Sequence, residues 1–380
     1  MMRNRHVYLA VILFGALALN GWLLKSSDSS GVLAGISFAV ACFSLSFFRP
    51  FGNERWPGLS VSTPPRRPVQ SASLTEANPA SAAQIVNAFT IDLEDYFHTE
   101  VSSRDVDFEQ WNKMPSRIES SVHRLLDLLD EHNTQATVFV LGWVAQRYPQ
   151  LIHEVARRGH EIGCHSFRHR RVNRLTPEIF AEDTRMAKEA IEDAIGAAVE
   201  GYRAPSFSIT PGTEWAFTIL EQLGFTYDSS VHPVWHATYA NMHAPRFPYH
   251  VTKNGFLEIP ISTWRVGSLN LPVGGGAYLR LLPYSYIHRG LSAVNQHEWQ
   301  PLNLYIHPWE IDYLQPAIHS DWMSHVRQVW GTRTMEAKLR RLLTSMRFAP
   351  IASVYARTLT SANAMVSTSA ERAPFFAQVS

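Results

Sequence analysis

Residues 161–169 read EIGCHSFRH, a short apolar run that ends in two histidines four positions apart. His165 and His169 can reach one metal ion if this segment forms a helical turn or a curled loop. The signal is weak by itself, because the chain has 17 histidines and some such pairs arise by chance on a surface. Two other strand-like runs, within residues 89–96 and 303–310, also end in carboxylates or a histidine. Strand ends of this kind are where parallel α/β scaffolds build metal sites.

The composition sets the limits for the fold and the partners. The chain has 380 residues, enough for one large domain with attached segments. The formal net charge is +1, so no charge bias favours a nucleic acid as a partner. Two cysteines, Cys42 and Cys164, give no disulfide framework and are consistent with a reducing compartment. Cys164 precedes the histidine pair, as either a soft metal ligand or a small buried residue.

The first fifty residues contain two apolar runs, at about 7–24 and 32–48, separated by the polar segment KSSDSS. Each run is long enough to cross a bilayer, which takes about 17–25 residues. No small-x-small cleavage site follows the first run, so we predict a transmembrane hairpin. Arginines flank the hairpin on both outer sides, which predicts that both ends lie in the cytoplasm. The alternative, a cleaved signal or a single anchor, would export the following domain to the periplasm.

Beyond the hairpin, residues 51–84 are rich in Pro, Ser, Arg and Ala and are predicted to be a linker. From residue 85 strand and helix patterns alternate, and repeated β-α-β units predict parallel strands in an open doubly wound sheet or a barrel. A Ser/Ala/Thr-rich tail from about Thr358 is predicted to be disordered. The predicted strands are 85–93, 136–141, 161–164, 201–204, 225–229, 255–262, 302–306 and 349–355, and the predicted helices are 115–132, 143–158, 176–195, 211–223 and 335–346.

An acidic cluster ends the first predicted strand. Asp92, Glu94 and Asp95 follow the apolar residues AFTI. A carboxylate at the end of a buried strand is unfavourable unless it is paired or bound to a metal. In an extended chain Asp92 and Glu94 lie on the same face, so one can bind a metal while the other takes a proton. The alternative is an N-cap at Asp92 followed by solvated loop residues.

Three later strand ends carry further candidates. Arg203 would meet Asp92 if the strand ends converge, and would hold that carboxylate ionised and oriented. Asp228 either orients a catalytic histidine, binds substrate or forms a turn. His307, in the stretch LYIHPWE, suits a general acid and could equally be a buried core histidine.

The order Asp, His-x-x-x-His, Arg-x-Pro, Asp, His resembles the polysaccharide deacetylases, known as the NodB-homology domain or carbohydrate esterase family 4. The resemblance covers about residues 86–310. It implies a distorted (β/α) barrel that removes N- or O-acetyl groups from sugar polymers with a divalent metal, usually zinc. It also implies that His165 and His169 are metal ligands, because HSFRH matches the family motif H-[ST]-x-x-H. Residues 203–205 match Arg-x-Pro, and Tyr305-Ile306-His307 matches the closing Leu-x-His with Tyr in place of Leu.

The first motif departs from the family pattern Thr-Phe-Asp-Asp-Gly, because residues 90–95 read TIDLED. Asp92 keeps the position of the base. The carboxylate ligand is then Glu94, which strand geometry favours, or Asp95. The stretches DLEDYF, GGGAY and HPWE look like the branch associated with exosortase-linked exopolysaccharide clusters, whose extra C-terminal region would cover roughly residues 230–356. The triple glycine at 274–276 is expected to be a flexible or closely packed loop beside the site.

We therefore expect a metal-dependent enzyme of exopolysaccharide biosynthesis that hydrolyses N-acetyl groups of an amino-sugar polysaccharide. Zinc would be held by His165, His169 and Glu94 or Asp95. Asp92 would take a proton from water, His307 would protonate the leaving amine, Arg203 would hold Asp92, and Asp228 would orient His307. The predicted parts are a membrane hairpin at 1–50, a linker at 51–84, a deacetylase domain at 85–357 and a tail at 358–380.

The expected partners are the N-acetylated polysaccharide, the bilayer of a bacterial inner membrane and exopolysaccharide synthesis or export proteins. The domain is expected on the cytoplasmic side. One alternative keeps the fold but hydrolyses a small cyclic amide or ureide. The other is a non-catalytic, membrane-anchored sugar-binding component of polymer export, against which the presence of both a base and an acid argues.

Overall fold

The computed structural model describes residues 85–234, 236, 241–318 and 322–360. The predicted hairpin, the predicted linker and residues 361–380 lie outside this range. No helix among the described residues is long and apolar enough to cross a membrane. Ile85 begins a compact unit of its own.

The described chain forms one nine-stranded sheet in the order β10-β1-β2-β3-β4-β5-β7-β6, with β11 also paired to β1. Neighbouring strands are parallel except β6, which is antiparallel to β7. A second sheet is the antiparallel hairpin β8–β9. The strands are β1 (Val86–Leu93), β2 (Thr137–Val140), β3 (Glu161–Cys164), β4 (Gly201–Tyr202), β5 (Tyr227–Asp228), β6 (Tyr249–His250), β7 (Leu257–Glu258), β8 (Thr263–Val266), β9 (Leu269–Pro272), β10 (Asn303–Ile306) and β11 (Arg347–Ala349).

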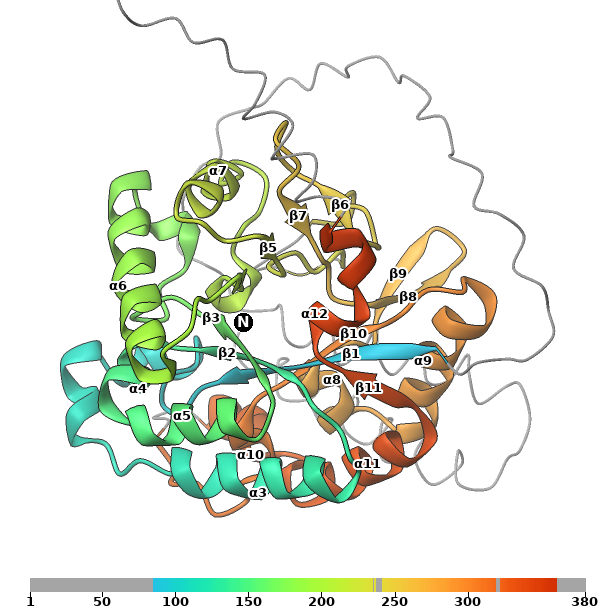
Figure 1. Cartoon of the computed structure of the whole chain (residues 1–380). Coiled ribbons are helices and arrows are strands. Elements are labelled where there is room, and N and C mark those ends of the chain that lie inside the picture. The colour runs from blue at the N-terminus through green and yellow to red at the C-terminus, as the bar shows by residue number, and fades with distance from the viewer. Residues whose placement is uncertain (1–84, 235, 237–240, 319–321, 361–380) are drawn as a thin grey trace, which may run out of the picture. The chain divides into compact units, whose positions relative to one another are not determined.

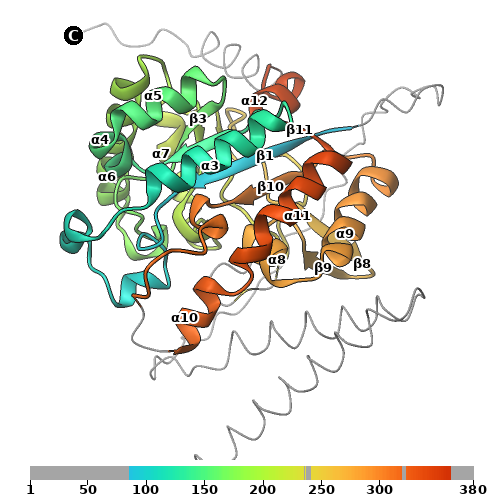
Figure 2. The ribbon, with the colours of Figure 1, turned by 90° about the horizontal axis from the view of Figure 1, so that it is seen from below.

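Helices cover the outside of the curled sheet. Figure 1 shows α3, α5, α6 and α11 around it, and Figure 2 shows α3 and α11 over β1. Because helices cover these strands, β1 is buried from Asn87 to Leu93 and reads as a nearly continuous apolar run. The helices are α3 (Ile118–Glu131), α4 (Gly142–Arg147), α5 (Pro149–Arg157), α6 (Pro177–Ile195), α7 (Trp215–Gln222), α8 (Gly276–Leu281), α9 (Tyr284–His297), α10 (Trp322–Val329), α11 (Thr332–Ser345) and α12 (Ile351–Val354).

The predicted parallel α/β architecture is confirmed, and the predicted barrel takes the form of a curled half-barrel. Loop residues bridge its two sides. The backbone N–H of Ser262 donates to the carbonyl of Asn303 (3.0 Å), and the N–H of Asn303 donates to the Ser262 hydroxyl (2.8 Å). Gly274 lies between the same two segments, donating to Ser262 O (3.1 Å) and accepting from the N–H of Tyr305 (2.8 Å). The two sides of the half-barrel are thus connected by individual hydrogen bonds of loop residues, and not by the regular hydrogen-bond ladder of paired strands.

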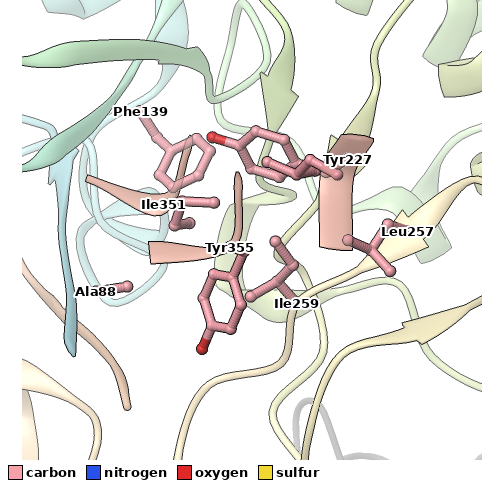
Figure 3. Close-up of a cluster of buried hydrophobic side chains, with 8 residues drawn as sticks. Ala88, Phe139, Tyr227, Leu257, Ile259, Ile351 and Tyr355 are labelled. Atoms are coloured by element: carbon pink, nitrogen blue, oxygen red, sulfur yellow. The ribbon is translucent and has the colours of Figure 1, made fainter. Parts of the chain in front are cut away.

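Apolar side chains fill the interior where the strands begin. Ile351 and Tyr355, from α12 and the residue after it, pack with Phe139, Tyr227 and Ile259, as Figure 3 shows. All five side chains are buried. The cluster includes Ala88 near the start of β1 and Tyr227 at the start of β5, whereas polar side chains gather near the strand ends.

Two predicted elements differ from the structure. The predicted helix 143–158 is two helices, because Pro149 has no N–H to continue α4 and begins α5. The predicted strand 349–355 is wrong: β11 ends at Ala349, and α12 follows Pro350. Its apolar residues recur three and four positions apart, which is the helical period. The sequence patterns also missed the β8–β9 hairpin and helices α8, α9 and α10.

Candidate functional site

Polar side chains converge where the central strands end. They come from segments far apart in the sequence, and parallel pairing of β10, β1, β2, β3 and β4 brings those ends to one edge of the sheet. The converging residues are Asp92 near the end of β1, Glu94 just after β1, His165 and His169 after β3, Arg203 after β4 and His307 after β10.

Glu94, His165 and His169 form a compact group of ligand atoms. Glu94 Oε1 lies 3.3 Å from Nε2 of each histidine, and the three ligand atoms lie within 4.8 Å of one another. Nδ1 of His165 donates to the carbonyl of Arg203 (2.8 Å), so its Nε2 carries the lone pair. That Nε2 is buried and makes no hydrogen bond within the described part of the chain. A buried lone pair of this kind, beside a second imidazole and a carboxylate, fits a divalent cation.

A second group of ligand atoms, from Asp92, Glu94 and His307, also lies within 4.8 Å. Glu94 belongs to both groups. Asp92 is already held by Arg203, whose Nη1 donates to Oδ1 at 2.7 Å. His307 Nε2 lies 3.9 Å from Asp92 Oδ2 and 3.6 Å from Glu94 Oε1. We therefore treat the group with two histidines after β3 as the candidate metal centre, and Asp92 and His307 as its neighbours.

The histidine pair lies in a curled loop instead of a helical turn. Ser166 and His169 have positive φ angles of 65° and 51°. Asp183 of α6 holds this loop: its Oδ2 accepts from the N–H of Phe167 (2.9 Å) and its Oδ1 from Arg168 (3.1 Å). Sequence analysis missed Asp183, because it resembles the other acidic residues of a charged helix.

The charges around Glu94 favour its ionised form. Burial raises the pKa of this carboxyl, but the nearby His169 and His307 outweigh burial and hold the pKa well below its usual range. A carboxylate that stays ionised in a buried site is suited to bind a cation.

Asp95 does not join this group, although it was the other candidate ligand. Its Oδ1 accepts from the N–H of Tyr96 (2.9 Å), and its Oδ2 accepts from the hydroxyl of Ser116 (2.7 Å) and the N–H of Arg117 (2.8 Å). The carboxylate therefore fixes the segment that leads into α3. Of the two candidates, the structure places only Glu94 among the histidines.

Arg203 meets Asp92 as expected. Both side chains are buried, and the same guanidinium also donates to the Thr90 hydroxyl (2.7 Å), Ser229 O (3.0 Å) and Ser229 Oγ (2.8 Å). It lies over the Phe139 ring, 4.2 Å from the centroid. These contacts leave the guanidinium no freedom to leave Asp92 Oδ1. Oδ2 of Asp92 is the oxygen that faces His307.

His307 is oriented by Glu310, and the expectation that Asp228 would do so is wrong. Nδ1 of His307 lies 3.2 Å from Glu310 Oε2, and the His307 ring stacks on Trp309 at a centroid distance of 5.2 Å. Burial lowers the pKa of His307, but Glu94, Glu310 and Asp92 outweigh burial and raise it to about 9. The carboxylates around the ring therefore favour its protonated form. In the sequence, Glu310 ends the stretch HPWE, three residues after His307, but no role was assigned to it.

Asp228 instead supports the segment after β4. Its Oδ1 accepts from the hydroxyl of Ser230 (2.6 Å), and that hydroxyl accepts from the N–H of Ala204 (2.7 Å). Asp228 also faces Glu258 on β7, which sequence analysis missed. Burial raises the pKa of Glu258 well above its usual range, and the adjacent Asp228 raises it further. Burial and the adjacent Asp228 therefore both favour the protonated form of Glu258. The Asp228 carboxylate accepts hydrogen bonds from Ser230, whereas Nδ1 of His307 faces Glu310.

Cys164 is not a ligand within the described part of the chain. Its thiol is buried, and burial raises its pKa, so it stays protonated. A protonated thiol is a poor metal ligand. Of the two alternatives for this residue, the small buried side chain is confirmed.

The fold and the site place this chain among α/β proteins that assemble their chemistry at the carboxyl edge of a curled parallel sheet. Residues 110–227 match the family model described as polysaccharide deacetylase, and residues 229–356 match a domain of unknown function (DUF3473). The first match and the relatives below show what this part of the chain is similar to. The matched span contains His165, His169 and Arg203, whereas Asp92 and His307 lie outside it.

Two curated relatives match part of the chain. A peptidoglycan-N-acetylglucosamine deacetylase of Bacillus cereus is 29% identical over 22% of this chain and 30% of its own length. A chitooligosaccharide deacetylase of Bradyrhizobium sp. is 33% identical over 21% of this chain and 37% of its own length. The matches thus span about a third of these relatives.

A solved structure shows the fold over a longer span. The crystal structure of a Mycobacterium smegmatis protein assigned to the polysaccharide deacetylases covers 76% of this chain and 96% of its own, with a TM-score of 0.50 and 21% identity. At this identity the likeness shows the fold alone.

Proposed function

We propose that this protein is a metal-dependent deacetylase that hydrolyses N-acetyl groups of an amino-sugar polysaccharide. Amide hydrolysis needs an activated water, an acceptor for its proton and a donor for the leaving nitrogen. The observation that carries the proposal is that Asp92 and His307 both lie next to the group of Glu94, His165 and His169.

Glu94, His165 and His169 would hold the metal ion. Two imidazoles and one carboxylate with a remaining open position are the donor set of catalytic zinc sites, and the tautomer of His165 is fixed for that role. We propose zinc, although such sites also accept cobalt, nickel or iron. When bound, the ion would lower the pKa of a water molecule and polarise the acetyl carbonyl.

Asp92 would accept the proton of the attacking water. Arg203 occupies Oδ1, so Oδ2 is the oxygen that can take the proton. The water oxygen bonds to the acetyl carbon as its proton passes to Asp92. The pairing with Arg203 keeps the carboxylate in one orientation through this step.

His307 would donate a proton to the leaving nitrogen from Nε2, the ring atom that faces Asp92 and Glu94. As the C–N bond breaks, the nitrogen takes this proton and leaves as the free amine, while the acetyl group leaves as acetate. The raised pKa of His307 favours the protonated ring that this step needs.

The substrate class follows from the relatives. Their names specify peptidoglycan N-acetylglucosamine and chitooligosaccharide as the acetylated sugars. We therefore propose an N-acetylhexosamine polymer as the substrate. The role in exopolysaccharide synthesis, with synthesis and export proteins as partners, rests on the resemblance of the stretches DLEDYF, GGGAY and HPWE.

The test is acetate release by the purified full-length chain from N-acetylglucosamine oligomers, with and without a chelator. We expect release that a chelator abolishes and that zinc restores. Release that resists chelation would contradict the metal role. A protein that retains metal but releases no acetate would favour a small cyclic amide as the substrate, and a protein with neither activity nor metal would favour the sugar-binding component.

We also propose that residues 1–50 anchor the protein in an inner membrane with the deacetylase domain in the cytoplasm. The flanking arginines support this orientation. Fusions after residue 84 to a reporter that is active only in the cytoplasm, and to one that is active only in the periplasm, test it. Activity of the periplasmic reporter alone would favour a single anchor.

A further inference from the structure

We infer that Glu310, anchored by Arg280, positions His307 as the proton donor, so that the region matching the domain of unknown function completes the active site. This inference rests on the proposed function. His307, Glu310 and Arg280 all fall within residues 229–356, outside the part of the chain that matches the deacetylase family. Glu310 acts through His307, so its role is to position the donor.

The carboxylate of Glu310 fixes His307 at two points. Its Oε2 accepts from the backbone N–H of His307 (3.1 Å) and lies 3.2 Å from Nδ1 of the same residue. A carboxylate accepts hydrogen bonds, so Nδ1 carries a hydrogen. Nε2 is then the atom directed toward Asp92 and Glu94. The stacked Trp309 ring limits rotation of the imidazole on one side.

Arg280 holds Glu310 in place inside the protein. Glu310 is fully buried, and Arg280 is 4% exposed. The guanidinium lies 3.4 Å from Glu310 Oε1 and donates to the carbonyls of Gln328 (3.1 Å) and Arg327 (2.8 Å), and to that of Trp330. A buried charge needs such partners. The pair therefore connects α8, the end of α10 and the turn that carries His307.

Gly276 provides the space that Glu310 occupies. A Cβ atom on Gly276 would lie 1.8 Å from Glu310 Oε2. The first residue of α8 must therefore lack a side chain for the carboxylate to reach His307. Gly274 and Gly275 also approach their neighbours closely, so the triple glycine is the closely packed loop of the two alternatives. Gly276 and Arg280 lie one helical turn apart on α8 and both contact Glu310.

Comparing the rates for two leaving groups distinguishes a lost positioning role of Glu310 from a loss of folding or of metal. An amine must take a proton to leave, whereas a nitrophenolate leaves without one. Loss of a correctly directed proton donor should therefore slow the hydrolysis of an N-acetyl amide more than that of 4-nitrophenyl acetate. A loss of folding or of the metal should slow both reactions equally.

The experiment measures kcat on both substrates, together with metal content, for full-length Glu310→Gln and Gly276→Ala. Gly276→Ala keeps every charge and only displaces the carboxylate. We expect each variant to lose about 10- to 100-fold in kcat on the amide, the range for partners that orient site residues, with little change on the aryl ester or in metal content. Glu310→Asp should recover part of the loss. Glu298→Gln is the matched control, because Glu298 pairs with Arg246 in the same region.

Each outcome decides the matter. Equal losses on both substrates, or no loss on the amide, would overturn the positioning role. Absence of amide hydrolysis by the wild-type chain would instead contradict the proposed function. For that case, ¹⁵N NMR of histidine-labelled protein, assigned with His307→Ala, gives a test without turnover: the Nδ1 hydrogen of His307 should exchange slowly in wild type and rapidly in Glu310→Gln. Slow exchange in both would overturn the inference.

Discussion

Residues 110–227 hold His165 and His169 in a loop fixed by backbone hydrogen bonds and one carboxylate, whereas residues 229–356 hold His307 through a series of buried charges. In the first region Asp183 accepts from the N–H of Phe167, and Arg203 O accepts from the ring of His165. In the second region the imidazole, Glu310 and Arg280 contact one another in sequence.

The difference suggests separate tasks for the two regions. Backbone carbonyls and N–H groups fix the direction of a neutral imidazole lone pair, which a metal needs. A carboxylate beside an imidazole keeps a hydrogen on the ring, which a proton donor needs. Changes in the first region should therefore remove metal, and changes in the second should reduce turnover while metal stays bound.

The largest effect is expected from His165→Ala. This change removes a proposed metal ligand and should abolish both metal binding and acetate release, as measured by elemental analysis of the purified protein and by an acetate assay. His123→Ala is the control, because His123 is on the surface and pairs with Glu154 outside the site. A variant that lacks His165 but retains stoichiometric metal would contradict the assignment of metal binding to residues 110–227.

The next effect is expected from His307→Ala. General acid catalysis contributes about 100- to 10,000-fold, so kcat for amide hydrolysis should fall by that order while metal content stays near that of wild type. Steady-state kinetics and elemental analysis on the same preparation measure both. Activity that persists in His307→Ala would show that another group protonates the leaving amine.

Glu94→Gln and Asp95→Asn sharpen the comparison between two adjacent carboxylates. Glu94→Gln should weaken zinc binding by at least about 10-fold, because the ionised ligand is lost. Asp95→Asn should keep zinc affinity but lower the free energy of unfolding by about 1–3 kcal/mol, since Ser116 Oγ or Arg117 N loses its acceptor. Zinc titration and urea unfolding separate the two effects. A larger loss of affinity in Asp95→Asn would reverse the ligand assignment.

The smallest effect concerns Glu258 and Asp228, where the two regions join. The folded-state pKa of Glu258 lies above its unfolded value, which is about 4.3. Its contribution to stability is therefore complete below about pH 4.3 and decreases as pH rises toward the folded-state pKa. Glu258→Gln keeps an uncharged side chain at every pH, so its free energy of unfolding should rise relative to wild type as pH increases.

Urea unfolding of both proteins between pH 5 and pH 9 measures this difference. Glu336→Gln is the control, because Glu336 forms partly exposed ion pairs with Arg124 and Arg340. A difference between wild type and Glu258→Gln that does not change with pH would contradict the raised pKa of Glu258.

Most of the parallel strands, and the edge of the sheet at which the site lies, could be predicted from the sequence, because the patterns that indicate them are local. The apolar run before Asp92 and the short runs before His165 and His307 each mark a buried strand that ends in a polar group. Parallel pairing then brings the ends together without further information. The β8–β9 hairpin and helices α8, α9 and α10 were missed because their sequences mix polar and apolar residues.

The sequence by itself determined the strand ends, the histidine pair and the carboxylate cluster, since each is a pattern within ten residues. Only the tertiary structure decided that Glu94 faces the histidines while Asp95 turns toward Ser116, and that Glu310, not Asp228, reaches His307. The physical reason is that the direction of a side chain depends on neighbours across the sheet. Those neighbours are set by the curl of the sheet and by the space left at Gly276, which no local pattern encodes.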